Sequence, residues 1–342
     1  MIQSLRNFAD RFLGRGDATI TVPSFDGALK PNQILEHAET VASFDAPEDL
    51  ATDGKTVYIA NDCAILDYRS GQRTEIRRFD KTITALCCLP DSGMAVVLDG
   101  REVRVFSAPT SAEATATITD PAMMAVNAIA PGPSGNLIAT NGSASRPYRQ
   151  WAHDLMERGR SGSVLSLDIK SGRVQTLASG LEYAFGACAA GNEYWISESW
   201  RHRVIAISPQ GSRRVVIGHL PAYPSRITQA TSGGYWLTAF IARTQLVEFV
   251  LRENAYRRRM MKEIDPEYWI VPKLKSGQSF LDPMQGAHIQ TMGVIKPWAA
   301  PRSYGLVIRL NASGAPLYGL HSRVDGVNHG IVAAVEADGA LF

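Results

Sequence analysis

Two side chains in this sequence could exchange protons with a small molecule near neutral pH. They are Glu48, in the segment APEDLA, and His329, in VNHG. A histidine titrates close to neutrality, and a carboxylate near it completes a general acid/base pair. Arg226, in YPSRIT, could hold a substrate carboxylate or an oxyanion, because its guanidinium offers several N–H donors. These residue types predict proton-transfer chemistry on a small molecule, including an anionic one.

A wider set of residues shares the same place in a repeated sequence pattern, and we expect it to surround that pair as substrate-binding groups. Its other members are Thr84, Asn127, Phe185, Ser225 and Asn328. A structural interpretation also fits the central residues. Glu48 and Arg226 could form a buried ion pair, and His329 could be a hydrogen-bonded strand residue.

The element that must position these residues is a hairpin that recurs along the chain. In each copy an apolar run meets a DG, SG, GN or GG turn, and a second strand-like run follows. The copies read DLATDGKTVYIAND from Asp49, ALCCLPDSGMAVVLD from Ala85, NAIAPGPSGNLIATNG from Asn127, GACAAGNEYWISES from Gly186, RITQATSGGYWLTAF from Arg226 and IVAAVEADGALF from Ile331.

Repetition of this hairpin predicts an all-β, six-bladed β-propeller over residues 17–342, as one domain. A single hairpin cannot bury both faces of its sheet, whereas a ring of blades can. The innermost strand of each blade lines the central channel. The residues just before each copy should therefore gather at one mouth of the ring, and concave openings with a few polar groups are where ligands bind.

Two stretches interrupt the repeat. Residues 144–162 contain a short helical pattern around Trp151, Leu155 and Met156. Residues 253–302, rich in Met, Pro and aromatic residues, form a longer insertion that could bring His288 to the site. Such excursions are commonly lids or binding loops, and packing against the side of the ring is the alternative.

The sequence also predicts a structure for a segment near each end of the chain. Residues 1–16 place Leu5, Phe8, Phe12 and Leu13 on one helical face, which predicts a short amphipathic helix docked on the ring, with a membrane-surface role as the alternative. The last hairpin supplies too few strands for a full blade. We expect residues 18–25 to close that blade as an extra strand.

Composition excludes several classes of partner. The chain has 35 basic and 33 acidic residues, a net charge of +2, so no strong field favours nucleic acid or an anionic membrane. No run approaches the ~18 apolar residues that a transmembrane helix needs. The N-terminus lacks a secretory signal pattern, which predicts a cytoplasmic protein. The four cysteines show no zinc-like spacing, and we expect free buried thiols.

The middle of the chain resembles the strictosidine synthase-like family of six-bladed propellers and, more distantly, the regucalcin/gluconolactonase and paraoxonase group. The matching segments start at Trp151, Ile196, His219 and Gly233, and include ISESWRHRVIAI, HLPAYPSRI and GGYWLTAF. Their order and spacing extend over residues 40–342. This resemblance implies a propeller fold and a ligand site at the channel mouth, but fold alone does not fix the chemistry.

Lactonase-like members of that group hold calcium at the mouth, and the resemblance places Glu48 and Asn127 where the first two ligands belong. Further oxygen ligands are expected, because calcium takes several. Here those positions carry Phe185, Ser225 and Arg226. We therefore favour no cofactor, with Ca²⁺ on Glu48 and Asn127 as the alternative, and the guanidinium could take the electrostatic place of a metal. The glutamate used by the alkaloid-forming members is replaced by Val332.

Three functions fit these observations. The first is a lactonase-like hydrolase of a cyclic ester or sugar-acid derivative. The second is a metal-independent lyase, isomerase or condensing enzyme that uses His329 and Glu48. The third is a non-catalytic ligand-binding propeller. Nucleophile-elbow, P-loop and dinucleotide-binding motifs are absent from the sequence.

Overall fold

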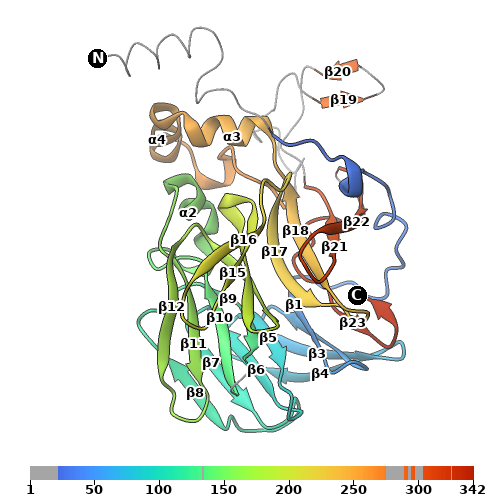
Figure 1. Cartoon of the computed structure of the whole chain (residues 1–342), viewed down its shortest axis with the longest axis vertical. Helices are drawn as coiled ribbons and strands as arrows, with labels where there is room; N and C mark the ends of the chain where they lie inside the picture. The colour runs from blue at the N-terminus through green and yellow to red at the C-terminus, as the bar shows by residue number, and fades with distance from the viewer. Residues whose placement is uncertain (1–21, 133–134, 275–288, 292–293, 297–302, 325) are drawn as a thin grey trace.

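Five four-stranded antiparallel sheets form the body of the molecule (Figure 1). The structure, a computed structural model, describes residues 22–132, 135–274, 289–291, 294–296, 303–324 and 326–342. Within each sheet the strands follow one another from the channel outwards, which is the arrangement of a propeller blade. The all-β propeller predicted from the hairpin repeat is therefore confirmed.

The first three blades take up the first half of the chain. Blade 1 consists of β1 (Pro47–Thr52), β2 (Val57–Asn61), β3 (Ala64–Arg69) and β4 (Gln72–Arg78). Blade 2 consists of β5 (Ile83–Cys88), β6 (Met94–Leu98), β7 (Glu102–Phe106) and β8 (Ala116–Thr119). Blade 3 consists of β9 (Val126–Pro131), β10 (Asn136–Asn141), β11 (Gly162–Asp168) and β12 (Val174–Leu181).

The other two blades follow the same plan. Blade 4 consists of β13 (Ala184–Ala190), β14 (Glu193–Glu198), β15 (Arg203–Ile207) and β16 (Arg213–Ile217). Blade 5 consists of β17 (Ala222–Gln229), β18 (Tyr235–Ala242), β21 (Leu306–Leu310) and β22 (Pro316–His321). Middle strands such as β6 are buried at every residue, because each blade is covered on both faces by its neighbours.

The predicted number of blades is wrong, because the described residues form five four-stranded blades instead of six. The last hairpin gives only a two-stranded sheet, β23 (Glu336–Ala337) and β24 (Ala340–Leu341). A turn at Asp338 and Gly339, both with positive φ, reverses the chain after two paired residues. This small sheet lies beside blade 1, where Val335 packs against β2. It also contacts blade 5, since Thr228 Oγ1 donates to Ala334 O over 2.8 Å.

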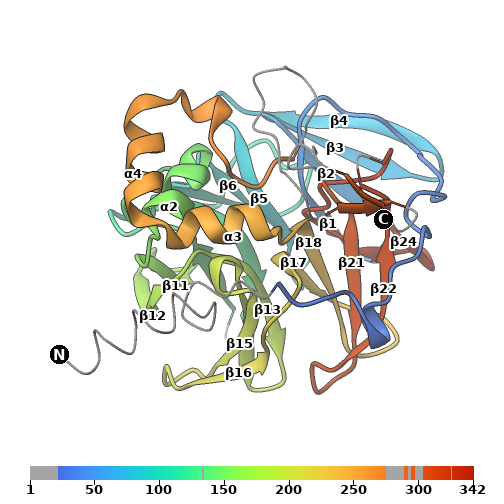
Figure 2. The same ribbon diagram turned by 90° about the horizontal axis from the view of Figure 1, so that it is seen from above.

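Helices cover one end of the propeller. Helix α2 (Trp151–Glu157) lies between β10 and β11, as predicted for residues 144–162. Helices α3 (Gln245–Arg252) and α4 (Asn254–Glu263) lie between β18 and β21, so the second insertion begins before residue 253. That insertion also holds a separate two-stranded sheet, β19 (Ile289–Thr291) and β20 (Val294–Lys296). Both insertions join the second and third strands of a blade, which places them at the same end of the ring (Figures 1 and 2).

An apolar cluster fastens this helical cap, which we define as α2, α3 and α4, to blades 4 and 5. Leu155 and Met156 of α2 and Val250 of α3 are buried in one cluster with Phe185 and Phe240 of the blades. Figure 2, seen from above, shows the cap over one side of the ring only. The remaining side of that face is not covered by these helices.

The predicted N-terminal helix, residues 1–16, lies outside the described residues. The expected closing strand, residues 18–25, is described only from Val22, and residues 22–25 form no strand. Pro23 lacks the N–H donor that a ladder would use there. Residues further along the chain bind the outer edge of blade 5 instead. Asn32 Nδ2 donates to Gly319 O over 2.8 Å, and Leu35 N donates to His321 O over 3.0 Å.

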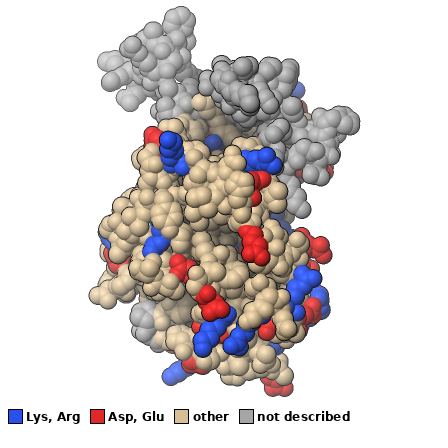
Figure 3. All heavy atoms as spheres, turned by 90° about the vertical axis from the view of Figure 1, so that its right-hand side faces the viewer, with Lys and Arg blue, Asp and Glu red and all other residues tan. Residues whose placement is uncertain are grey.

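Charge and cysteine usage follow the sequence expectations. On the face drawn in Figure 3, basic and acidic residues are interspersed. All four cysteines are free thiols, as predicted, but only Cys87 and Cys188 are buried, whereas Cys63 and Cys88 are partly exposed. In the part of the chain that the structure describes, no helix is both long and apolar enough to cross a membrane.

Candidate functional site

Each of the five inner strands carries a β-bulge near its beginning. In β1, Pro47 pairs with Asn61 and Asp49 pairs with Ala60, so Glu48 is the extra residue. The corresponding residues are Thr84 in β5, Asn127 in β9, Phe185 with Gly186 in β13, and Ser225 with Arg226 in β17. Bulges bend a strand and redirect a side chain. Most of the residues predicted from the repeat therefore sit where the strands turn them toward the channel.

Arg226 crosses the channel and joins the inner strands of other blades. Its Nη1 donates to the main-chain oxygen of Glu48 over 2.8 Å. Its Nη2 donates to the main-chain oxygens of Thr84 and Asn127, each over 2.8 Å. One guanidinium thus holds blades 1, 2, 3 and 5 together through bulged residues, whose main-chain oxygens are free to accept because the ladder is interrupted there.

Two further contacts complete this arrangement. The Phe185 ring centroid lies 5.2 Å from the Arg226 guanidinium carbon, a cation–π distance. Val332 O, in the segment before β23, lies 3.5 Å from Nη1. The arginine side chain is only 5% exposed. It therefore contacts the inner strand of every blade and the last segment of the chain.

Two carboxylates face this single buried guanidinium. Glu48 Oε1 lies 3.2 Å from Nη2, and Asp49 Oδ1 lies 3.0 Å from Nε, although the second pair lacks hydrogen-bond geometry. Burial raises the pKa of Glu48, while Arg226 opposes that shift. Burial likewise raises the pKa of Asp49 to about 6, again against Arg226. The cluster thus holds one more carboxyl than its guanidinium can neutralise, so one of them readily carries a proton.

Tyr148 completes the surroundings of Glu48, and the repeat gave no signal for it. It comes from the 3₁₀ turn Tyr148–Gln150 that precedes α2, and its hydroxyl donates to Glu48 Oε1. Burial raises the pKa of Tyr148 well above 10, so it stays a phenol at neutral pH. The Glu48 side chain is 24% exposed, against 5% for Asp49 and Arg226. Glu48 is therefore the most exposed member of the cluster.

Other predicted site residues tie neighbouring inner strands together. Thr84 Oγ1 donates to Val126 O over 2.7 Å, and Asn127 Nδ2 donates to Ala184 O over 3.0 Å. Ser225 Oγ lies 2.7 Å from Thr238 Oγ1. All three predicted residues are buried. Inner strands of adjacent blades share no ladder, so Thr84 and Asn127 make polar connections between them, whereas the Ser225 contact lies within blade 5.

This geometry does not suit a calcium ion on Glu48 and Asn127. Asn127 Oδ1 accepts from Thr140 Oγ1 over 2.8 Å, so both polar atoms of the amide serve the fold. The guanidinium of Arg226 occupies the space between Glu48 and the Asn127 main chain. A divalent cation there would be repelled by the arginine. Among the described residues, no group of three His, Cys, Asp or Glu side chains is placed to hold a metal.

The predicted partners from the end of the chain make hydrogen bonds of their own. His329 Nδ1 is 2.5 Å from Ser303 Oγ, and Asn328 Nδ2 donates to Leu35 O over 2.7 Å. No hydrogen bond or ion pair within the described ranges joins His329 to Glu48. The His329–Glu48 pair therefore stays a prediction, and His288 lies outside the described residues.

A second polar cluster anchors the helical cap. Glu248 of α3 accepts from Arg243 Nε over 3.1 Å and from Tyr223 OH over 3.2 Å, and His202 Nε2 lies 3.3 Å away. Burial opposes ionisation of Glu248, but the hydrogen bonds from His202 and Arg243 outweigh it and lower the pKa to about 2. This ionised carboxylate fixes α3 to blades 4 and 5.

Comparison with known proteins supports the propeller fold. No protein-family profile matches the chain. Over 218 residues it is 24% identical to adipocyte plasma membrane-associated protein of Salmo salar, covering 59% of this chain and 44% of that protein. The chain thus spans less than half the length of this curated relative.

The solved structures that resemble this chain include lactonase and regucalcin propellers. A gluconolactonase from Xanthomonas campestris superposes with a TM-score of 0.54 at 11% identity, covering 87% of this chain and 82% of that one. A calcium-binding regucalcin from Agrobacterium tumefaciens gives a TM-score of 0.44 at 15% identity, covering 61% and 71%. At such identities the likeness concerns the fold alone. The strictosidine synthase-like assignment stays a prediction.

Proposed function

We propose that this protein is a lactonase-like hydrolase that opens a cyclic ester or sugar-acid lactone at the channel mouth, with Glu48 as its catalytic carboxylate. The observation that carries the proposal is the position of Glu48. It is the most exposed member of a buried charge cluster, placed by a β-bulge and held by both Arg226 and Tyr148. The propeller fold shared with a gluconolactonase supports the substrate class by analogy.

In this proposal Glu48 acts as a general base. It takes a proton from a water molecule, whose oxygen attacks the lactone carbonyl carbon. The ring C–O bond then breaks, and the leaving alkoxide receives the proton back from Glu48. A raised pKa suits this role, because a base is most effective when its pKa approaches the working pH. Tyr148 acts as a positioning residue that fixes the carboxylate through its hydroxyl.

Arg226 takes the electrostatic place that a cation has in the lactonases this chain resembles. Its N–H groups are directed at main-chain oxygens and at the two carboxylates. Because its N–H groups are used in this way, Arg226 holds Glu48 in place and does not bind the substrate directly. The proposed hydrolysis therefore uses no metal.

A panel of five- and six-membered lactones, including sugar-acid lactones, tests this function with the full-length protein. Turnover by the wild type should fall by at least about a hundredfold in Glu48→Gln, the typical scale for loss of a proton-transfer group. Glu75→Gln is the matched control, because Glu75 lies on the outer strand of the same blade and pairs only at the surface with Arg78. No turnover of any lactone by the wild type would contradict the proposal.

A metal-independent lyase or isomerase is the second candidate. The observation that favours it is again Glu48, because a carboxyl that is easily protonated can move a proton within a substrate without adding water. Mass spectrometry of products formed in ¹⁸O-labelled water separates the two. Incorporation of one ¹⁸O indicates hydrolysis, and an unlabelled product indicates the lyase or isomerase. Binding of the panel without any turnover would indicate a ligand-binding propeller.

A further inference from the structure

A cavity of about 560 Å³ occupies the other end of the central channel. It is lined by the later residues of all five inner strands, whereas Glu48 and the other bulged residues lie at the beginnings of those strands. Asp49 and Arg226 close it on the side of the mouth. The guanidinium thus lies between Glu48 and this cavity, which we name the lower cavity.

The closed end of the lower cavity carries the Asp49 carboxylate beside the Arg226 guanidinium. Arg226 Nε is buried, lies 3.0 Å from Asp49 Oδ1, and has no hydrogen bond of its own. Asp49 accepts from the main-chain nitrogens of Leu50 and Leu86, over 2.8 and 2.9 Å. A carboxylate can accept about four hydrogen bonds, so capacity remains. A ligand group that donates a hydrogen bond would use the remaining capacity of Asp49.

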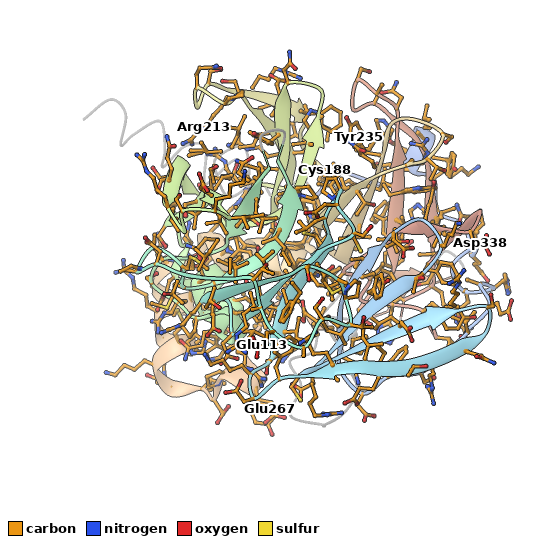
Figure 4. All side chains as sticks on the ribbon, turned by 90° about the horizontal axis from the view of Figure 1, so that it is seen from below. Glu113, Cys188, Arg213, Tyr235, Glu267 and Asp338 are labelled. Carbon is orange, nitrogen blue, oxygen red and sulfur yellow. The ribbon has the colours of Figure 1, made fainter. Side chains whose placement is uncertain are left out.

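The walls of the lower cavity are mostly apolar and uncharged. They include Ile129, Ala187 and the thiols of Cys88 and Cys188. Burial raises the pKa of each of these two thiols to about 12, so they remain neutral. Figure 4, seen from below, shows Cys188 nearer the middle of the propeller than Arg213 or Asp338. The wider end carries polar residues such as Gln229 and Glu336.

We propose that the lower cavity binds a neutral, largely apolar small molecule through a single hydroxyl or carboxamide group. That group donates to the Asp49 carboxylate, while the apolar body packs against the walls. The volume lies within the roughly 300–1,000 Å³ typical of small-molecule sites. This site shares Asp49 and Arg226 with the cluster that holds Glu48, but the binding proposed here does not require the proposed hydrolysis.

Titration of the full-length protein with 2-naphthol and with naphthalene tests the proposal, because the two probes differ only in the hydroxyl. We expect 2-naphthol to bind at least about tenfold more tightly, the effect of a hydrogen bond to a charged group. Asp49→Asn should abolish that preference. Equal affinities of the two probes for the wild type would overturn the proposal.

A blocking variant locates the site even if Asp49→Asn fails to fold. Ala189 lines the lower cavity near its open end, away from the charge cluster. Ala189→Trp should remove 2-naphthol binding, whereas Ala38→Trp, on the exposed N-terminal segment, should leave it unchanged. Unchanged 2-naphthol binding in Ala189→Trp, or displacement of 2-naphthol by calcium alone, would contradict the assignment.

Discussion

Arg226 Nη1 donates to the main-chain oxygen of Glu48 over 2.8 Å, although 178 residues separate the two in the sequence. The bond joins blade 5 to blade 1, across the gap where the last hairpin supplies only two short strands. A complete sixth blade would close such a ring by packing against the blades on either side of it. Here a buried guanidinium contributes to the closure by bonding main-chain oxygens from inside the channel.

Removing this guanidinium should therefore destabilise the whole ring. Arg226→Met leaves Glu48 and Asp49 without their cation and three main-chain oxygens without a donor. We expect the free energy of unfolding to fall by about 3–5 kcal/mol, as for other broken buried ion pairs. Urea unfolding measures this, with the exposed Arg213→Met as control. Equal stability of the two variants would show that the channel arginine does not hold the ring.

Hydroxyl contacts between inner strands should make a smaller contribution. Thr140 Oγ1 donates to Asn127 Oδ1 over 2.8 Å and lies 3.0 Å from Phe185 O, joining blades 3 and 4. Thr140→Val keeps the shape but loses these bonds, and should cost about 1–3 kcal/mol of stability. Thr140→Ser keeps the hydroxyl and should lose less. A melting temperature of Thr140→Val equal to or above that of Thr140→Ser would show that these hydrogen bonds do not stabilise the protein.

The hairpin repeat predicted more of the fold than of the site. Turn residues and apolar runs are local signals, so the blades and the gathering of Glu48, Thr84, Asn127 and Phe185 around one channel followed from them. The bulges could not be predicted, because an extra residue in one strand is recognised only from its pairing with the neighbouring strand. Tyr148 was missed since it lies in an insertion outside the repeat. The length of the last sheet depends on a turn that the hairpin pattern could not position.

Tyr148 should set the pH dependence of the proposed reaction. Its hydrogen bond lowers the pKa of Glu48 against the larger, opposite effect of burial. Tyr148→Phe removes that bond, so the pKa of Glu48 should rise and the acidic limb of the kcat/KM profile should move to higher pH. A profile measured between pH 4 and 9 on the best lactone checks this. A shift to lower pH, or no shift, would argue against Glu48 as the base.

The contribution of Glu248, which anchors the helical cap, to the free energy of unfolding should decrease in acid. Its pKa of about 2 in the folded protein lies below its ordinary value of 4.5, so the unfolded chain binds more protons between these values. The stabilisation is present above pH 4.5, amounts to at most about 3 kcal/mol, and is lost as the pH falls toward 2. The stability difference between wild type and Glu248→Gln should therefore shrink with falling pH. A constant difference from pH 7 to pH 3 would contradict this.

The central claim is that Glu48 is the catalytic carboxylate and that Arg226, beside it, takes the place of a metal. The direct measurement is kcat/KM for the best lactone substrate, with wild type and Glu48→Gln both treated with a chelator of calcium. We predict that the wild type keeps its full kcat/KM after chelation, and that Glu48→Gln loses at least about a hundredfold while its melting temperature shows a folded protein. Loss of wild-type activity on chelation with recovery on adding calcium, or an unchanged kcat/KM in Glu48→Gln, would contradict it.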